Sequence, residues 1–151
     1  MISSRLVVGL LSMWLFGNLY EQIVWNPQLL ADPRPGTLVG TFAAGSPVYY
    51  YLPWAPLGVA LAVVTRVRLP RTAPGRVLRA WNVALGCLAV ALAMKILLIT
   101  QVNPLFRDPA ASREQVHDHA VLWAFGNGIT VVTVAAALLL ITGRARGAAP
   151  D

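Results

Sequence analysis

Four long apolar stretches alternate with polar connections along the chain, at about residues 6–25, 48–64, 80–100 and 120–142. A helix needs about 20 predominantly apolar residues, within a range of about 17 to 25, to cross a hydrocarbon core ~30 Å thick. Each stretch falls within this range. The pattern therefore predicts an all-α protein, a four-helix transmembrane bundle that forms a single membrane domain over residues 1–151.

Composition and charge agree with a membrane protein and orient it. The chain is 57% hydrophobic and 12% charged, against about 25% charged residues in soluble domains. Its net charge of +6 does not indicate a nucleic-acid partner, because the arginines lie beside the apolar stretches. They gather near the chain ends and between the second and third stretches, at Arg5, Arg66, Arg68, Arg71, Arg76, Arg79, Arg144 and Arg146. The positive-inside rule then predicts a multi-pass protein of the cell membrane with both termini cytoplasmic, in contact with membrane lipids.

The same dipeptide marks the expected ends of two spans. The residue before a proline is disfavoured in the helical region of backbone space. The first span is therefore predicted to end at Asn26-Pro27, and the third at Asn103-Pro104.

Two ionisable residues lie clearly inside the spans, where polar groups are costly and usually face the interior of a bundle. Glu21 lies in the outer part of the first span, and Lys95 lies six residues before Gln101 at the outer end of the third. Their depths are similar. Two interpretations stay open: a Glu21–Lys95 bridge that fixes helix packing, or a functional site that contains both residues.

Other polar and aromatic residues recur at helical spacing beside these charges. The first span carries a stripe of Asn18, Glu21, Gln22 and Trp25. The fourth span carries His119, Trp123 and Asn127. The second span adds Tyr49, Tyr50, Tyr51 and Trp54 at the same level. Together they predict a substrate pocket in the outer half, although tyrosines are also typical of an interfacial belt and asparagines of interhelical hydrogen bonds.

A short cluster of possible metal ligands precedes the fourth span. His117-Asp118-His119 follows Glu114, and Glu-x-x-His on one helix is half of a di-iron site. One copy is present where two are needed, which favours a hydrated helix N-terminus without metal. No phosphate-binding loop, haem motif or zinc signature occurs, so we expect no cofactor.

The second half of the chain resembles small four-helix membrane proteins related to anthrone oxygenases. The resemblance rests on Trp123-x-x-x-Asn127 before an apolar span and on the segment Asn103-Pro104-Leu105-Phe106. Thr130 occupies the position where that family usually has an arginine. The resemblance implies an enzyme of aromatic polyketide or similar lipophilic metabolism that uses oxygen without a bound metal or flavin.

These observations lead to two functional hypotheses. The first is a cofactor-independent enzyme that oxidises, isomerises or cyclises a lipophilic small molecule, with Glu21, Lys95 and His119 as its acid–base groups. The second is a non-enzymatic membrane protein that binds a small molecule, or is a subunit of a larger complex or homo-oligomer. Few polar residues occupy the inner halves of the spans, which weighs against transport.

Overall fold

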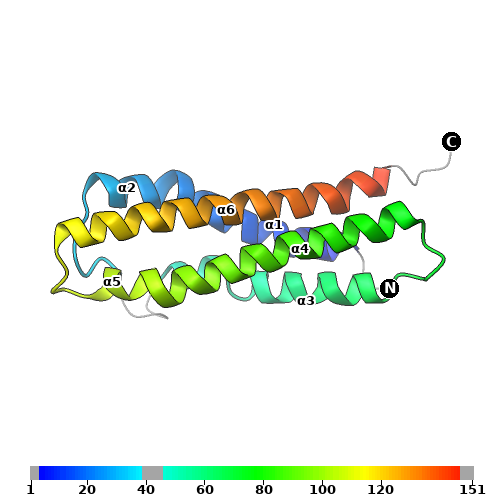
Figure 1. Ribbon diagram of the computed structural model, residues 1–151, viewed down its shortest axis with the longest axis horizontal. Coiled ribbons are helices and arrows are strands. Elements are labelled where there is room, and N and C mark those ends of the chain that lie inside the picture. The colour runs from blue at the N-terminus through cyan, green and yellow to red at the C-terminus, as the bar shows by residue number, and fades with distance from the viewer. Residues whose placement is uncertain (1–3, 39–45, 147–151) are drawn as a thin grey trace.

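The computed structural model describes residues 4–38 and 46–146, and these residues form helices and turns without any β-strand. Four main helices run along the long axis of the molecule (Figure 1): α1 (Ser4–Tyr20), α3 (Trp54–Val67), α4 (Gly75–Leu97) and α6 (Arg113–Arg146). Helix α4 packs along α6 and α1 packs along α3, while contacts between α1 and α6 and between α3 and α4 complete a ring. An all-α fold is thus confirmed for the described residues.

Shorter helical elements extend the main helices. The π-helix η1 (Glu21–Trp25) and helix α2 (Asn26–Ala31) continue α1, and the π-helix η3 (Leu98–Val102) and helix α5 (Asn103–Arg107) continue α4. A 3₁₀ turn, η2 (Pro47–Tyr50), precedes α3. The helical paths therefore pass through both Asn-Pro dipeptides, where the sequence predicted helix ends.

The π-helices explain how the chain remains helical at these prolines. A proline inside an α-helix lacks the amide N–H and its ring collides with the carbonyl four residues earlier. Here the amide of Asn26 donates to the carbonyl of Glu21, five residues earlier, and Asn103 donates to Leu98 in the same way. Each widened turn lies immediately before the proline. It makes room for the ring, so the helix continues.

Three helices are long and apolar enough to cross a membrane: Ser4–Ala31, Gly75–Arg107 and Arg113–Gly143. Helix α3, in the second predicted span, is apolar but has 14 residues, or about 21 Å of helix at 1.5 Å per residue. The structure thus confirms three helices of spanning length and one shorter apolar helix.

The outer surface is apolar and the interior contains charge, which is the reverse of a soluble protein. Phe16, Phe125 and Leu139 are 69%, 72% and 73% exposed, whereas Glu21 and Lys95 are 0% and 4% exposed. Lipid chains are a suitable environment for such a surface.

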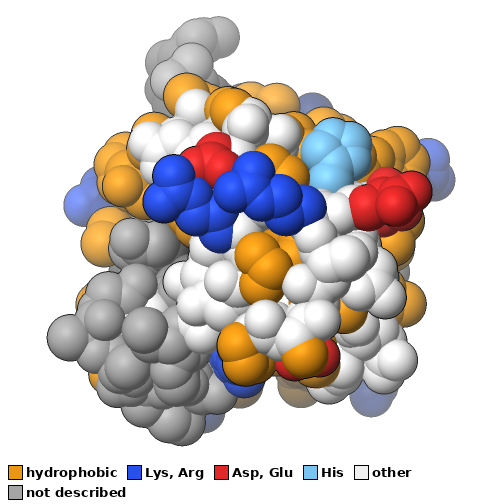
Figure 2. Space-filling model, turned by 90° about the vertical axis from the view of Figure 1, so that its left-hand side faces the viewer, with side chains coloured by type: hydrophobic (Ala, Val, Ile, Leu, Met, Phe, Trp, Pro, Cys, Tyr) orange, Lys and Arg blue, Asp and Glu red, His pale blue; other side chains and the backbone are white. Residues whose placement is uncertain are grey.

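Polar groups lie at the two ends of the molecule. The start of α1, the end of α6 and the connection between α3 and α4 lie at one end (Figure 1), where Arg66 Nε donates to Asn82 Oδ1 at 2.7 Å. Figure 2 shows the opposite end, near α2, α5 and the start of α6, where basic, acidic and histidine side chains lie among apolar ones.

Close packing of α3 on α1 depends on Gly58, and this supplies a first prediction. A Cβ atom at Gly58 would lie 2.9 Å from Cδ2 of Leu11, which is fully buried. A Cβ atom at Gly86 on α4 would meet nothing within 4 Å. Gly58→Leu should therefore lower the free energy of unfolding by about 1–3 kcal/mol through overpacking. Gly86→Leu is the matched control and should be neutral or slightly stabilising. Thermal unfolding in detergent measures both, and equal melting temperatures would contradict the close contact.

Candidate functional site

A polar layer divides the buried core of the molecule into two apolar clusters. One cluster includes Trp14, Leu88, Ala91 and Val134, and the other includes Leu29, Leu98, Phe106 and Trp123. Besides Ser46 and Asn103, the buried polar residues of the described chain fall between these clusters, in α1, η1, α2, α4 and α6: Asn18, Glu21, Asn26, Lys95, Asn127 and Thr130. Polar side chains from separate helices therefore meet at one level of the core.

An ion pair lies at the centre of this layer. Lys95 Nζ donates to Glu21 Oε2 at 2.9 Å, so the bridge considered from the sequence does form. The hydroxyl of Tyr51 donates to Glu21 Oε1 and accepts from Lys95 Nζ at 3.1 Å. Tyr51 is 6% exposed and lies between η2 and α3. A carboxylate, an ammonium group and a phenol are thus in mutual hydrogen-bond contact.

The third donor of Lys95 determines the orientation of the neighbouring amides. Lys95 Nζ donates to Asn127 Oδ1 at 2.8 Å, and an ammonium group can only donate. Asn127 Nδ2 must therefore face away from Lys95. It donates to the backbone carbonyl of Asn18 at 2.9 Å and to Gln22 Oε1 at 3.0 Å. Asn26 Nδ2 also donates to Gln22 Oε1, at 3.0 Å. One cation thus fixes the direction of a hydrogen-bond chain across three helical segments.

Aromatic rings cover the ion pair on the side of α2 and α5. Lys95 Nζ lies 4.3 Å from the centroid of the Tyr51 ring and 5.1 Å from that of Trp123, within the range of cation–π attraction. Trp25, Phe106 and Trp123 pack edge to face, with centroids 5.9–6.1 Å apart. We call these three residues the aromatic trio. They separate the polar layer from the end shown in Figure 2.

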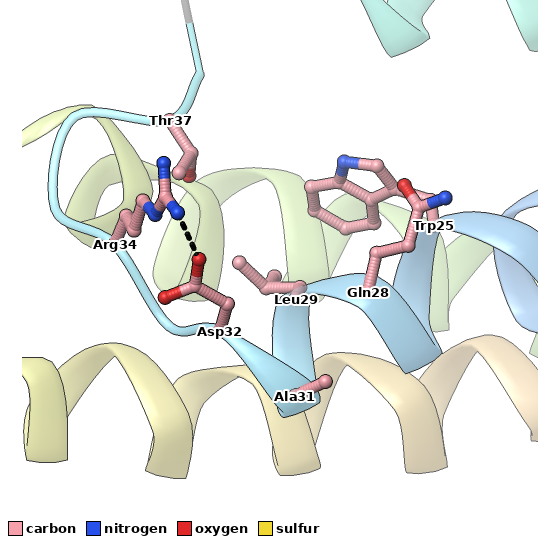
Figure 3. Close-up of a pocket in the computed structure, with 7 residues that line it drawn as sticks. All are labelled: Trp25, Gln28, Leu29, Ala31, Asp32, Arg34 and Thr37. Carbon is pink, nitrogen blue, oxygen red and sulfur yellow. Dashed lines mark ion pairs between the residues drawn. The ribbon is translucent and has the colours of Figure 1, made fainter.

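Beyond the aromatic trio lies an open cleft of about 510 Å³, which Trp25, Gln28, Asp32 and Arg34 help to line (Figure 3). Arg34 pairs with Asp32 on the side of the cleft away from Trp25 (Figure 3), and Arg113 Nη1 lies 3.9 Å from the same carboxylate. The hydrogen bond from Arg34 lowers the pKa of the Asp32 carboxyl. Asp32 is therefore ionised at neutral pH and balances the nearby arginines.

Several predicted site residues lie outside the polar layer. Tyr49 is 51% exposed, Trp54 packs half-buried against the apolar core, and the side chain of Tyr50 lies outside the described residues. His119 Nδ1 contacts the carbonyl of its own helix neighbour Gln115 at 3.0 Å, and no described hydrogen bond joins it to Lys95. Among the hydrogen bonds of the described side chains, the one that joins a predicted tyrosine to Glu21 comes from Tyr51.

The histidines lie within α6 because this helix begins earlier than the predicted span. Ser112 Oγ accepts from the Gln115 amide and Gln115 Oε1 accepts from the Ser112 amide, which is a capping box. Within residues 4–38 and 46–146, no three His, Cys, Asp or Glu side chains come together as metal ligands.

Sequence reasoning missed two residues of the polar layer, Asn26 and Thr130. Asn26 belongs to the polar layer, and its spacing was visible because Asn18, Gln22 and Asn26 follow at i, i+4 and i+8. The proline after Asn26 hid this signal by predicting a helix end. Thr130 is fully buried, and its hydroxyl donates to the Gly126 carbonyl at 3.1 Å. Its hydrogen bond lies within its own helix.

Comparison with protein-family models, with curated proteins and with solved structures found no match to this chain. The resemblance to anthrone oxygenases therefore rests on Trp123, Asn127 and the segment Asn103-Pro104-Leu105-Phe106. The geometry of the polar layer carries the functional argument.

The buried ion pair leads to a second prediction. Lys95→Met leaves Glu21 unpaired between two apolar clusters, which should lower the free energy of unfolding by about 3–5 kcal/mol. The double variant Glu21→Gln/Lys95→Met removes both charges and should recover most of this loss. Asp32→Asn, which breaks the exposed pair with Arg34, is the control and should leave the melting temperature unchanged. A Lys95→Met protein as stable as the wild type would contradict the pairing.

Proposed function

We propose that this chain is a four-helix transmembrane protein that performs acid–base chemistry on a lipophilic small molecule at Glu21, Lys95 and Tyr51. The single observation that carries the proposal is the buried contact of a carboxylate, an ammonium group and a phenol near the middle of apolar helices. Ionisable groups at membrane depth are costly, and they commonly mark proton relays or substrate sites.

The arrangement supplies the parts that proton transfer requires. Glu21 uses one oxygen for Tyr51 and the other for Lys95, and an ionised carboxylate has about four lone-pair sites, so it can still accept a proton. The Lys95 ammonium compensates the negative charge, and the Tyr51 hydroxyl can share or return a proton. Such positioned groups commonly contribute 10²–10⁴-fold to a reaction rate.

The proposed substrate is a hydrophobic molecule that reaches the polar layer through the membrane or past the aromatic trio. The resemblance to anthrone oxygenases adds aromatic polyketides as the first class to examine, with oxidation by molecular oxygen, isomerisation or cyclisation as the reaction. The chemistry proposed here uses side chains of this chain and no cofactor. In this proposal all four helices cross the cell membrane, and the arginine-rich connection and both termini face the cytoplasm.

A second candidate is a non-enzymatic role in binding or assembly, and one observation favours it. Glu21 and Lys95 are 0% and 4% exposed, and neither lines the cleft beside Trp25. In that case the ion pair fixes helix packing alone.

Turnover measurements separate the two candidates and form a third prediction. The wild-type protein is purified in nanodiscs, co-purified ligands are identified by mass spectrometry, and turnover is measured on those ligands and on lipophilic polyketides. Glu21→Gln should reduce turnover at least 100-fold by removing the proton acceptor, and Tyr51→Phe should reduce it about tenfold.

Glu114→Gln changes an exposed carboxyl at the start of α6 and serves as the matched control. It should retain wild-type turnover. A folded Glu21→Gln protein with unchanged turnover would remove Glu21 from the chemistry and leave the packing role.

A further inference from the structure

An apolar groove of about 470 Å³ lies where η1 meets α6, on the lipid-facing side of the molecule. Phe125 and Val132 form part of its wall and are 72% and 67% exposed, so the groove is open to the hydrocarbon of the membrane. Gln22 and Thr133 are the polar residues of its lining. The Thr133 hydroxyl is occupied, because it donates to the Ile129 carbonyl at 2.8 Å.

Gln22 offers the groove a free hydrogen-bond donor. Its Oε1 atom accepts from Asn127 and Asn26, which leaves the amide nitrogen facing the groove. No described residue accepts a hydrogen bond from this nitrogen, and Gly128 leaves it uncovered, since a Cβ atom there would lie 3.9 Å from Nε2. Lys95 imposes this orientation of the Gln22 amide: it holds Asn127 Oδ1, so that Asn127 Nδ2 points at Gln22 Oε1.

The depth of the groove restricts what can satisfy this donor. Gly128 lies eight residues after Ala120, where the apolar part of α6 begins, or about 12 Å of helix rise. The ester oxygens of phospholipids lie at the boundary of the ~30 Å hydrocarbon core. An acyl chain in the groove therefore brings no acceptor to Gln22, and an unpaired amide in hydrocarbon is unfavourable.

We propose that this groove is a binding site for an uncharged lipophilic ketone, whose carbonyl oxygen accepts a hydrogen bond from Gln22 Nε2. The volume falls within the usual range of about 300–1,000 Å³ for small-molecule sites. The proposal concerns binding alone and does not depend on the proton chemistry proposed for Glu21, which turnover tests separately.

Benzophenone provides a direct test because it is itself a lipophilic ketone and forms covalent bonds with nearby C–H groups under ultraviolet light. The full-length protein in nanodiscs is labelled with benzophenone, and the labelled residues are mapped by mass spectrometry. Labelling should concentrate on α6 around Phe125, Ile129 and Val132. Gln22→Leu removes the donor and should reduce this labelling about fivefold, the effect expected for one hydrogen bond.

Two variants keep the test independent of folding. Gln101→Leu removes an exposed glutamine amide from η3 and should leave groove labelling unchanged. Gly128→Leu fills the groove beside Gln22, where a Cβ atom would meet Nε2 at an ordinary van der Waals distance of 3.9 Å, so it should abolish groove labelling while the protein remains folded. Fluorenone should compete with benzophenone more strongly than fluorene, which has the same ring system without the carbonyl.

Four outcomes would overturn the proposal. Uniform labelling of the lipid-facing surface would exclude a specific site. Equal labelling of Gln22→Leu and Gln101→Leu, or equal competition by fluorene and fluorenone, would exclude recognition of the carbonyl. A groove that is labelled in nanodiscs holding one copy of the chain but protected in nanodiscs holding two would show that a second copy covers it.

Discussion

A buried ammonium group needs three hydrogen-bond acceptors, and the arrangement of this molecule depends on how Lys95 finds them. They come from Glu21, Tyr51 and Asn127, on three separate segments. Apolar contacts alone specify the relative height of membrane helices poorly, because lipid tails are as apolar as leucine side chains. Sliding one helix by a turn would leave a charge unpaired in the apolar core. The cation therefore determines the height at which the helices meet.

The main features of the fold followed from residue patterns. Long apolar stretches predicted α1, α4 and α6, and polar residues at helical spacing predicted that Glu21, Asn127 and their neighbours face the interior. The second span was harder to predict, because the apolar stretch begins at Val48 while helix α3 begins at Trp54 after a 3₁₀ turn.

Other details could not be read from the sequence, for physical reasons. The rule that proline ends helices is sound for an α-helix but fails where a π-helix widens the preceding turn, as before Pro27. Three consecutive tyrosines carry no periodic signal, so Tyr51 could not be distinguished from Tyr49. His119 shares the stripe of Trp123, yet its ring contacts the backbone carbonyl of Gln115, one turn earlier in α6, and lies eight residues before Asn127, the residue of this helix that hydrogen-bonds to Lys95.

The aromatic trio has a consequence for the membrane as a barrier to ions. A carboxylate and an amine at this depth are groups on which protons could hop, and a continuous file of water from the cleft beside Asp32 would connect them to the aqueous phase. The close-packed rings of Trp25, Phe106 and Trp123 interrupt such a file of water, because apolar constrictions exclude water. In the transmembrane arrangement proposed above, the titratable groups of the interior would therefore not dissipate a proton gradient.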